Sequence, residues 1–89
     1  MPLPLGMMRI ERQHRVRGRR TTIVLEAAYW EALEQAADEL HRPVRDVVSE
    51  VCGAVRGTYQ GEQFNQALRV WVVEFYRRKL EQVEQVWKE

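Results

Sequence analysis

The segment "RVRGRRTTIVLEAAYW", Arg15–Trp30, decides how this chain folds. It starts with four arginines within six residues, continues as a stretch rich in β-branched residues and ends where a helical pattern begins. The alternation in "RTTIVL" predicts a short strand. Its faces are Thr21, Ile23 and Leu25 on the inward side and Arg20, Thr22 and Val24 on the outward side.

Length and composition describe one small domain. The chain has 89 residues, of which 45% are apolar and 30% charged, as in ordinary globular proteins. Cys52 is the single cysteine, so no disulfide can form within the chain. No apolar run reaches the length of a membrane span, and "MPLPLGMM" at the N-terminus is too short for a signal core. We therefore expect a cytoplasmic protein that does not enter membranes.

The net charge of +1 hides a strong asymmetry. Residues 1–25 carry six arginines and one acid, a charge of +5, whereas residues 26–89 carry eight basic and twelve acidic residues, a charge of −4. A basic segment on a mildly acidic body indicates a polyanionic partner, because the local field steers association. The alternative is a solvated tail that aids solubility. Few acids lie among these arginines, which favours contact with nucleic-acid phosphates.

The rest of the chain predicts helices. Residues 26–40 place apolar side chains on one helical face, "HRP" at His41–Pro43 ends that helix, and a second amphipathic helix follows from Val44 to Val55. "GTYQG", Gly57–Gly61, predicts a loop. A third helix from an Asn65 N-cap to Trp87 would be about 35 Å long.

This order contains one strand and no candidate for a second. A single strand needs a hydrogen-bonding partner, so we expect a two-fold dimer in which the strands of two copies pair antiparallel. Residues 1–14, with two prolines and a glycine, are interpreted as a flexible basic arm. Residues 15–80 form the mainly α domain, and residues 81–89 extend the third helix toward a partner or solvent.

Three segments, in this order and spacing, resemble a known family. They are "GRRTTIVLE" (Gly18–Glu26), "YWEALEQAA" (Tyr29–Ala37) and "ALRVWVVEFYR" (Ala67–Arg77). They resemble the ribbon-helix-helix class of DNA-binding proteins, and in particular a bacterial subfamily with an added C-terminal helix. The resemblance covers roughly residues 15–78. It implies a homodimeric transcriptional regulator, nucleoid-associated when bound, whose paired strands enter the major groove of double-stranded DNA, with dimers able to bind side by side.

The resemblance also implies which residues touch the bases. Arg20, Thr22 and Val24 occupy the outward positions of the strand. Arginine can donate two hydrogen bonds to guanine, and threonine can contact a base through its hydroxyl or its methyl group. Val24 departs from the polar residue that is usual in the family and would contact a thymine methyl group.

Phosphate contacts are implied at two places. The resemblance places backbone N–H groups of the second helix, here at Val44, against a phosphate. Pro43 replaces the usual Ser or Thr cap, and Arg42 and Arg45 can compensate as phosphate ligands. The arginines beside the strand, Arg15, Arg17 and Arg19, are the other expected phosphate contacts. The expected dimer core is Ile23, Leu25, Trp30, Leu33, Val47 and Val51.

Other chemistries find no support. Ser49 has no histidine within helical reach, and Gly57 and Gly61 lack the lysine of a phosphate-binding loop, so we expect no enzyme and no cofactor. His14 and His41 are far apart, so we expect no metal site. The second hypothesis is that the same scaffold binds a protein partner instead of DNA, for example through its third helix.

Overall fold

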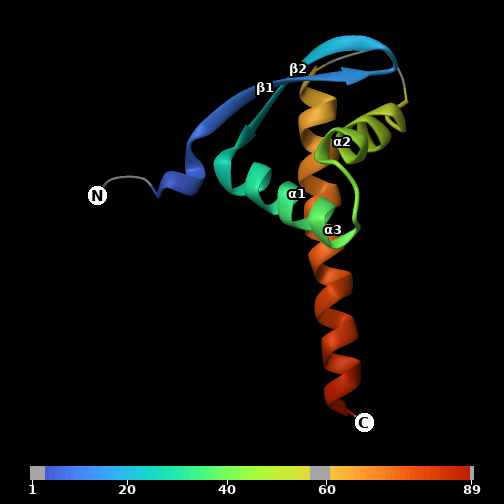
Figure 1. Ribbon diagram of the computed structural model, residues 1–89. Coiled ribbons are helices and arrows are strands. Elements are labelled where there is room, and N and C mark those ends of the chain that lie inside the picture. Colours follow the sequence, from blue (N-terminus) through green and yellow to red (C-terminus); the bar gives the residue numbers. More distant parts are fainter. Residues whose placement is uncertain (1–3, 57–60, 89) are drawn as a thin grey trace.

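The computed structural model describes residues 4–56 and 61–88, with side chains as far as residue 85. A short 3-10 turn, Leu5–Met7, precedes two strands, β1 (Arg9–Val16) and β2 (Arg19–Glu26). Three helices follow, α1 (Ala27–Glu39), α2 (Val44–Gly53) and α3 (Gly61–Lys88), as Figure 1 shows. An antiparallel two-stranded sheet followed by three helices, the last one long, confirms the predicted mainly α ribbon-helix-helix architecture.

The expectation of a single strand is wrong. β1 pairs antiparallel with β2 of the same chain, from Arg9 opposite Glu26 to Val16 opposite Arg19. Residues 9–14 therefore lie in a strand and do not form a flexible arm. The hairpin supplies the backbone partner that β2 needs, so the strand itself no longer requires a second copy.

A two-residue turn joins the strands. Arg17 and Gly18 both have positive φ angles, 53° and 77°. This is the type I′ geometry, whose twist matches that of the flanking strands. The Arg17 guanidinium donates to the carbonyl oxygens of Gly53, at 2.8 and 3.2 Å, and of Val55. The turn is thereby fastened to the C-terminal end of α2.

The inward face of the hairpin rests on the helices. Thr21, Ile23 and Leu25 of β2 are buried, which confirms the predicted alternation. On the corresponding side of β1, Val16 is buried, and the two polar side chains in the middle of the strand, Arg12 and His14, are covered by Trp30 of α1. The Arg12 guanidinium lies 4.8 Å from the Trp30 ring and the His14 ring stacks on it at 5.6 Å.

The "HRP" break between α1 and α2 is confirmed. The Arg42 N–H donates to the Ala37 carbonyl at 2.9 Å and the His41 N–H donates to the Asp38 carbonyl at 3.1 Å. These two bonds form a Schellman motif, with His41 at the left-handed position and a φ of 56°. Pro43 then caps α2 without any side-chain hydrogen bond.

α3 begins earlier than expected. It starts at Gly61 and runs for 28 residues, so it is about 42 Å long. Asn65 is not its N-cap: the side chain is 7% exposed inside the helix, and its Oδ1 accepts the Val24 N–H at 3.1 Å. Of the predicted "GTYQG" loop, residues 57–60 lie outside the described residues, and Gly61 belongs to the helix.

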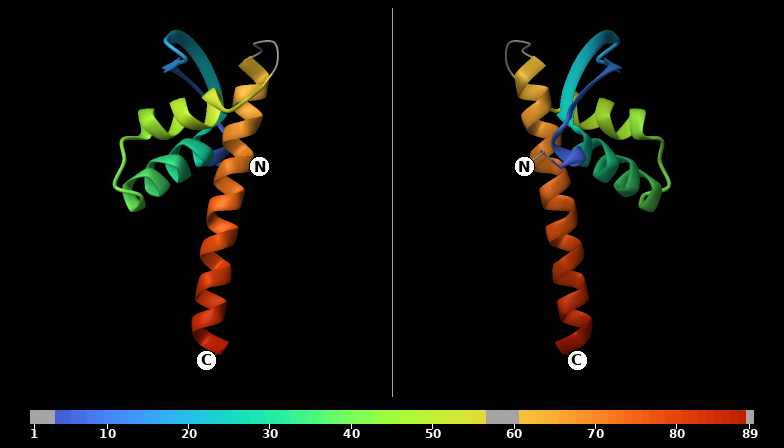
Figure 2. Two further views of the ribbon diagram at one scale, coloured as in Figure 1. Left: turned by 90° about the vertical axis from the view of Figure 1, so that its right-hand side faces the viewer. Right: turned by 90° about the vertical axis from the view of Figure 1, so that its left-hand side faces the viewer.

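The core forms within one chain. Five of the six residues expected in the dimer core are already buried there, and Val51 is half-buried. The five are Ile23, Leu25, Trp30, Leu33 and Val47. Their contact with a second chain stays a prediction. The sheet, α1 and α2 lie around the N-terminal half of α3, and its C-terminal half extends beyond them (Figure 2). In residues 4–56 and 61–88 no helix has the length and apolar content that a bilayer span requires.

Candidate nucleic-acid interface

The outward face of the hairpin contains side chains from both strands. Residues directly opposite one another in an antiparallel pair share a face. On this face Arg15 lies opposite Arg20, Gln13 opposite Thr22, and Glu11 opposite Val24. All of these side chains are exposed except Val24, which is half-buried. The three predicted base contacts therefore lie on one accessible face, as the alternation predicted.

Positive charge gathers at the turn end of the hairpin. Arg15 and Arg20 are cross-strand neighbours on the outward face, and Arg19, opposite Val16, is exposed beside the turn. Like charges directly opposite each other repel and destabilise a sheet. In the described part of the chain, no carboxylate pairs with any of these three arginines, whereas Arg12 pairs with Glu34 at 2.7 Å. An external polyanion would relieve this repulsion.

Gln13 is a candidate that sequence reasoning missed. Its Nε2 donates to the Thr22 Oγ1 at 2.7 Å, which orients both side chains on the outward face. Glutamine can bind adenine through two hydrogen bonds, and threonine can contact either kind of base. Recognising β1 as a strand would have revealed Gln13, because the register of β1 with β2 determines which β1 side chains face outward.

The other end of the hairpin is less suited to anions. Glu11 lies on the outward face, and Glu26 accepts bonds from Arg69 Nε at 3.0 Å and Nη2 at 3.3 Å. The hydrogen bonds from Arg69 lower the pKa of Glu26, so the carboxylate stays charged. Asn65 occupies the β2 edge at Val24. The capacity to bind phosphate therefore concentrates near the turn.

The second predicted phosphate site lies elsewhere. Arg17 contacts the C-terminal end of α2, so the N-terminal end, with Arg42, Val44 and Arg45, is about 15 Å away along the helix. Arg42 pairs with Glu50, and Arg45 lies 4.0 Å from Asp46. The predicted phosphate ligands thus form two separate groups, and α2 spaces them.

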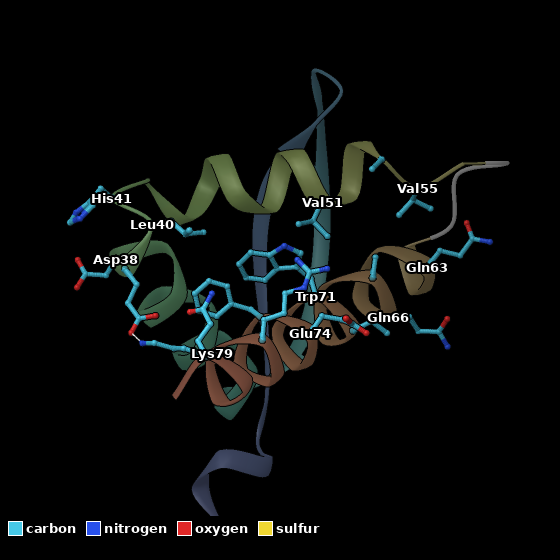
Figure 3. Close-up of a pocket in the computed structure, with 17 residues that line it drawn as sticks. Asp38, Leu40, His41, Val51, Val55, Gln63, Gln66, Trp71, Glu74 and Lys79 are labelled. Carbon is cyan, nitrogen blue, oxygen red and sulfur yellow. Dashed lines mark hydrogen bonds and ion pairs between the residues drawn. The ribbon is translucent and has the colours of Figure 1, made fainter. Parts of the chain in front are cut away.

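A groove of about 1470 Å³ opens between α2 and α3 (Figure 3). It is lined by Val51 of α2, by Val55 just after that helix, and by Val70, Trp71 and Phe75 of α3. Charged side chains stand at its rim, among them Asp38, Glu74 and Lys79. An apolar floor with a charged rim suits a protein surface better than a nucleic acid.

The single thiol of the chain, Cys52, contributes neither to the outward face of the hairpin nor to the groove between α2 and α3. Cys52 is fully buried, and burial raises its pKa to about 12. It is therefore protonated and unreactive at neutral pH. Among the described residues, no three metal-ligating side chains come together.

The sequence matches the model of the ribbon-helix-helix domain over residues 9–76, and the chain belongs to this family. Ribbon-helix-helix domains are DNA-binding modules, typically without enzymatic activity. The matched region starts at the first residue of β1, so it includes the whole hairpin.

A solved structure has the same fold. An uncharacterized protein from Bordetella pertussis Tohama I is similar with a TM-score of 0.73 and 22% sequence identity. The similarity covers 86% of this chain and 62% of that one, so this chain spans less than two thirds of that protein's length. At this identity the likeness concerns the fold alone. No curated protein matches the chain.

Proposed function

We propose that this protein is a homodimeric, sequence-specific DNA-binding regulator of transcription that inserts its β1–β2 hairpin into the major groove. One observation carries the proposal: Arg15 and Arg20 lie side by side, without carboxylate partners among the described residues, next to the hydrogen-bonded Gln13–Thr22 pair. A two-stranded ribbon fits the major groove, and the family membership supports this mode of binding.

Base reading would use both strands. Arg15 and Arg20 are each able to donate two hydrogen bonds to a guanine, and Gln13 can do the same for an adenine. Thr22 and Val24 can contact thymine methyl groups. Because the two strands have different sequences, one hairpin would read an element without internal symmetry. A two-fold dimer would then read two such elements, each with its own hairpin.

Phosphate contacts would come from two places. Arg19 lies beside the turn, and Arg42, Val44 and Arg45 lie at the N-terminal end of α2. Helix N-termini favour phosphate because their N–H groups point outward and the helix dipole is positive there. We assign Arg17 to holding the turn, since its guanidinium is engaged by the carbonyl groups of α2.

The test compares arginine variants on DNA. Arg20→Ala should weaken binding to the preferred site by about 1–3 kcal/mol and relax the preference at one position. Arg19→Ala should weaken binding to all duplexes alike and flatten the dependence on salt. Fluorescence anisotropy against specific and random duplexes, at several salt concentrations, measures both effects.

Arg78→Ala is the matched control, because it removes the same charge from an exposed position on α3. It should leave both DNA affinity and the salt slope close to those of the parent. Equal affinities of Arg20→Ala and Arg78→Ala for the preferred site would refute insertion of the hairpin into the groove.

The groove between α2 and α3 supports a second candidate function, the binding of a protein partner. Its floor exposes Val70 next to the half-buried Trp71 and Phe75. Binding to random duplex weaker than about 10⁻⁴ M at physiological salt would favour this function over DNA binding. Val70→Asp would then abolish capture of the protein partner, and under the first proposal it would leave DNA affinity unchanged.

A further inference from the structure

α3 is longer than the domain requires. Phe64, Leu68 and Val72 of its first half are buried against the rest of the chain. The hydrogen bond from Tyr76 Oη to the Ala32 carbonyl, at 3.3 Å, and the ion pair of Lys79 with Glu39 lie near the end of this contact. Every described side chain from Arg77 to Gln85 is exposed, and Figure 1 shows this part of the helix standing clear of all other elements.

An apolar stripe runs along α3 from the end of its packed part into this exposed part. Val73, Leu80 and Val83 are 49%, 64% and 49% exposed, and Tyr76 lies between them in the stripe. Their spacing of three, four and three residues is the heptad spacing of a coiled-coil seam, and Trp87 continues it in the sequence. The outer positions Glu81, Gln82 and Gln85 are polar. In a helix surrounded by water these apolar side chains would stay exposed, whereas packing against a second helix would bury them.

The charges beside the stripe fit a second copy of the same helix. With Leu80 at a and Val83 at d, Lys79 occupies position g and Glu84 occupies position e. In a parallel two-stranded coiled coil, g of one helix faces e in the following heptad of the other. Lys79 of each chain would thus meet Glu84 of the other, twice around the two-fold axis. To form this contact, Lys79 would give up its ion pair with Glu39 of its own chain. The loss would be small, because exposed ion pairs contribute little to stability.

We infer that the apolar stripe of α3, residues 73–83, is a dimerisation surface whose partner is the same segment of a second copy in parallel orientation. The hairpin lies at the opposite end of α3 from its C-terminus (Figure 1). Parallel helices therefore place both hairpins at one end of the dimer, where both can reach a single duplex. This choice of orientation rests on the proposed function, whereas the stripe and its charges do not.

The experiment measures the mass of the full chain by sedimentation equilibrium. The double variant Leu80→Glu/Val83→Glu should weaken dimerisation at least a hundredfold, because it places four carboxylates in the seam. Gln82→Glu/Gln85→Glu adds the same charge to the outer positions of the same segment and should leave the dimer intact. Far-UV circular dichroism checks that both variants stay folded. A monomeric parent, or a dimer that Leu80→Glu/Val83→Glu leaves unchanged, would overturn the inference.

Cross-linking tests the orientation. Two Val83 side chains face each other in a parallel seam, so Val83→Cys should form an intermolecular disulfide on oxidation. Gln85→Cys, on the outer surface, should not, and the buried Cys52 does not compete. A disulfide that forms only when Leu80→Cys and Val83→Cys chains are mixed would indicate antiparallel helices and overturn the parallel arrangement.

DNA titrations keep this inference separate from the proposed function. If the monomeric Leu80→Glu/Val83→Glu chain still binds a duplex through Arg20 with reduced affinity, both proposals are supported. If the parent is a seam-dependent dimer that binds no duplex at low salt, the seam stands and the proposed function fails.

Discussion

Arg17 holds a backbone conformation that arginine rarely adopts. Its φ of 53° lies in the left-handed region, where glycine, asparagine and aspartate are preferred in two-residue hairpins. Its guanidinium donates to carbonyl groups at the C-terminal end of α2, where helix carbonyls lack partners and the dipole is negative. These bonds offset the backbone cost and fix the hairpin over the helix.

Arg17→Ala should therefore lower the free energy of unfolding by about 1–2 kcal/mol, because it removes these bonds but keeps the strained turn. Urea denaturation measures the effect. Arg19→Ala is the control: no described residue pairs with that side chain, so its effect should stay within about 0.5 kcal/mol. A variant Arg17→Ala as stable as Arg19→Ala would show that the bonds to α2 do not stabilise the fold.

Among the described residues, His41 is the other non-glycine residue with a left-handed backbone conformation. It occupies the position of the Schellman motif where glycine is the usual choice. His41→Gly should raise the free energy of unfolding by roughly 0.5–1 kcal/mol, since it removes the clash of the side chain with the backbone. Glu31→Gly, in the middle of α1 and exposed, should instead lower it by about 1 kcal/mol. Thermal unfolding that shifts both variants downward would contradict this account of the motif.

At the scale of elements, the sequence allowed β2 to be predicted and left β1 unrecognised. β2 alternates between Thr21, Ile23 and Leu25 inside and polar or smaller residues outside. β1, "RIERQHRV", has arginine and histidine at inward positions, because the face of Trp30 covers them. On this side of β1 the apolar alternation is interrupted, because Arg12 and His14 stand between Ile10 and Val16, and "RG" is not a usual type I′ turn sequence. Both sequence signals of a hairpin were therefore weak.

The same contact makes the hairpin sensitive to pH. Burial beside Trp30, and then the charge of Arg12, lower the pKa of His14 below its ordinary 6.5. Below pH 6.5 the unfolded chain takes up a proton that the folded hairpin resists, so stability must fall as the pH falls. Protein at pH 5.5 should unfold at a lower urea concentration than at pH 7.5.

His14→Phe keeps a ring against Trp30 but cannot bind a proton, so it should lose part of this pH dependence. The Glu26 carboxyl contributes only at lower pH, because its pKa is held below the ordinary 4.5. If the parent and His14→Phe show the same loss of stability between pH 7.5 and 5.5, the burial of His14 has no energetic consequence.

For the whole molecule, the candidate site was predictable in part. The charge asymmetry and the phase of β2 placed Arg20, Thr22 and Val24 on the outward face, where Arg20 and Thr22 are exposed and Val24 is half-buried. The separation of Arg15 from Arg17 was not predictable, because it depends on the turn: one side chain faces outward opposite Arg20 and the other reaches α2. The position of Gln13 on the outward face could be assigned only from the register of β1 with β2. The contact of Asn65 with β2 could be assigned only from the position at which α3 starts.

The pairing of β1 with β2 within one chain also determines how the molecule folds. A ribbon shared between two chains can form only when they meet, so its folding rate depends on protein concentration. Here a two-residue turn joins the strands, and closure of such a hairpin takes about 1–10 μs. Contacts this local in sequence favour rapid, first-order folding. A nascent chain can therefore complete its hairpin before it encounters a second copy. The backbone N–H and C=O groups that β1 and β2 pair with each other are then no longer open to pairing with another chain, which would lead to aggregation.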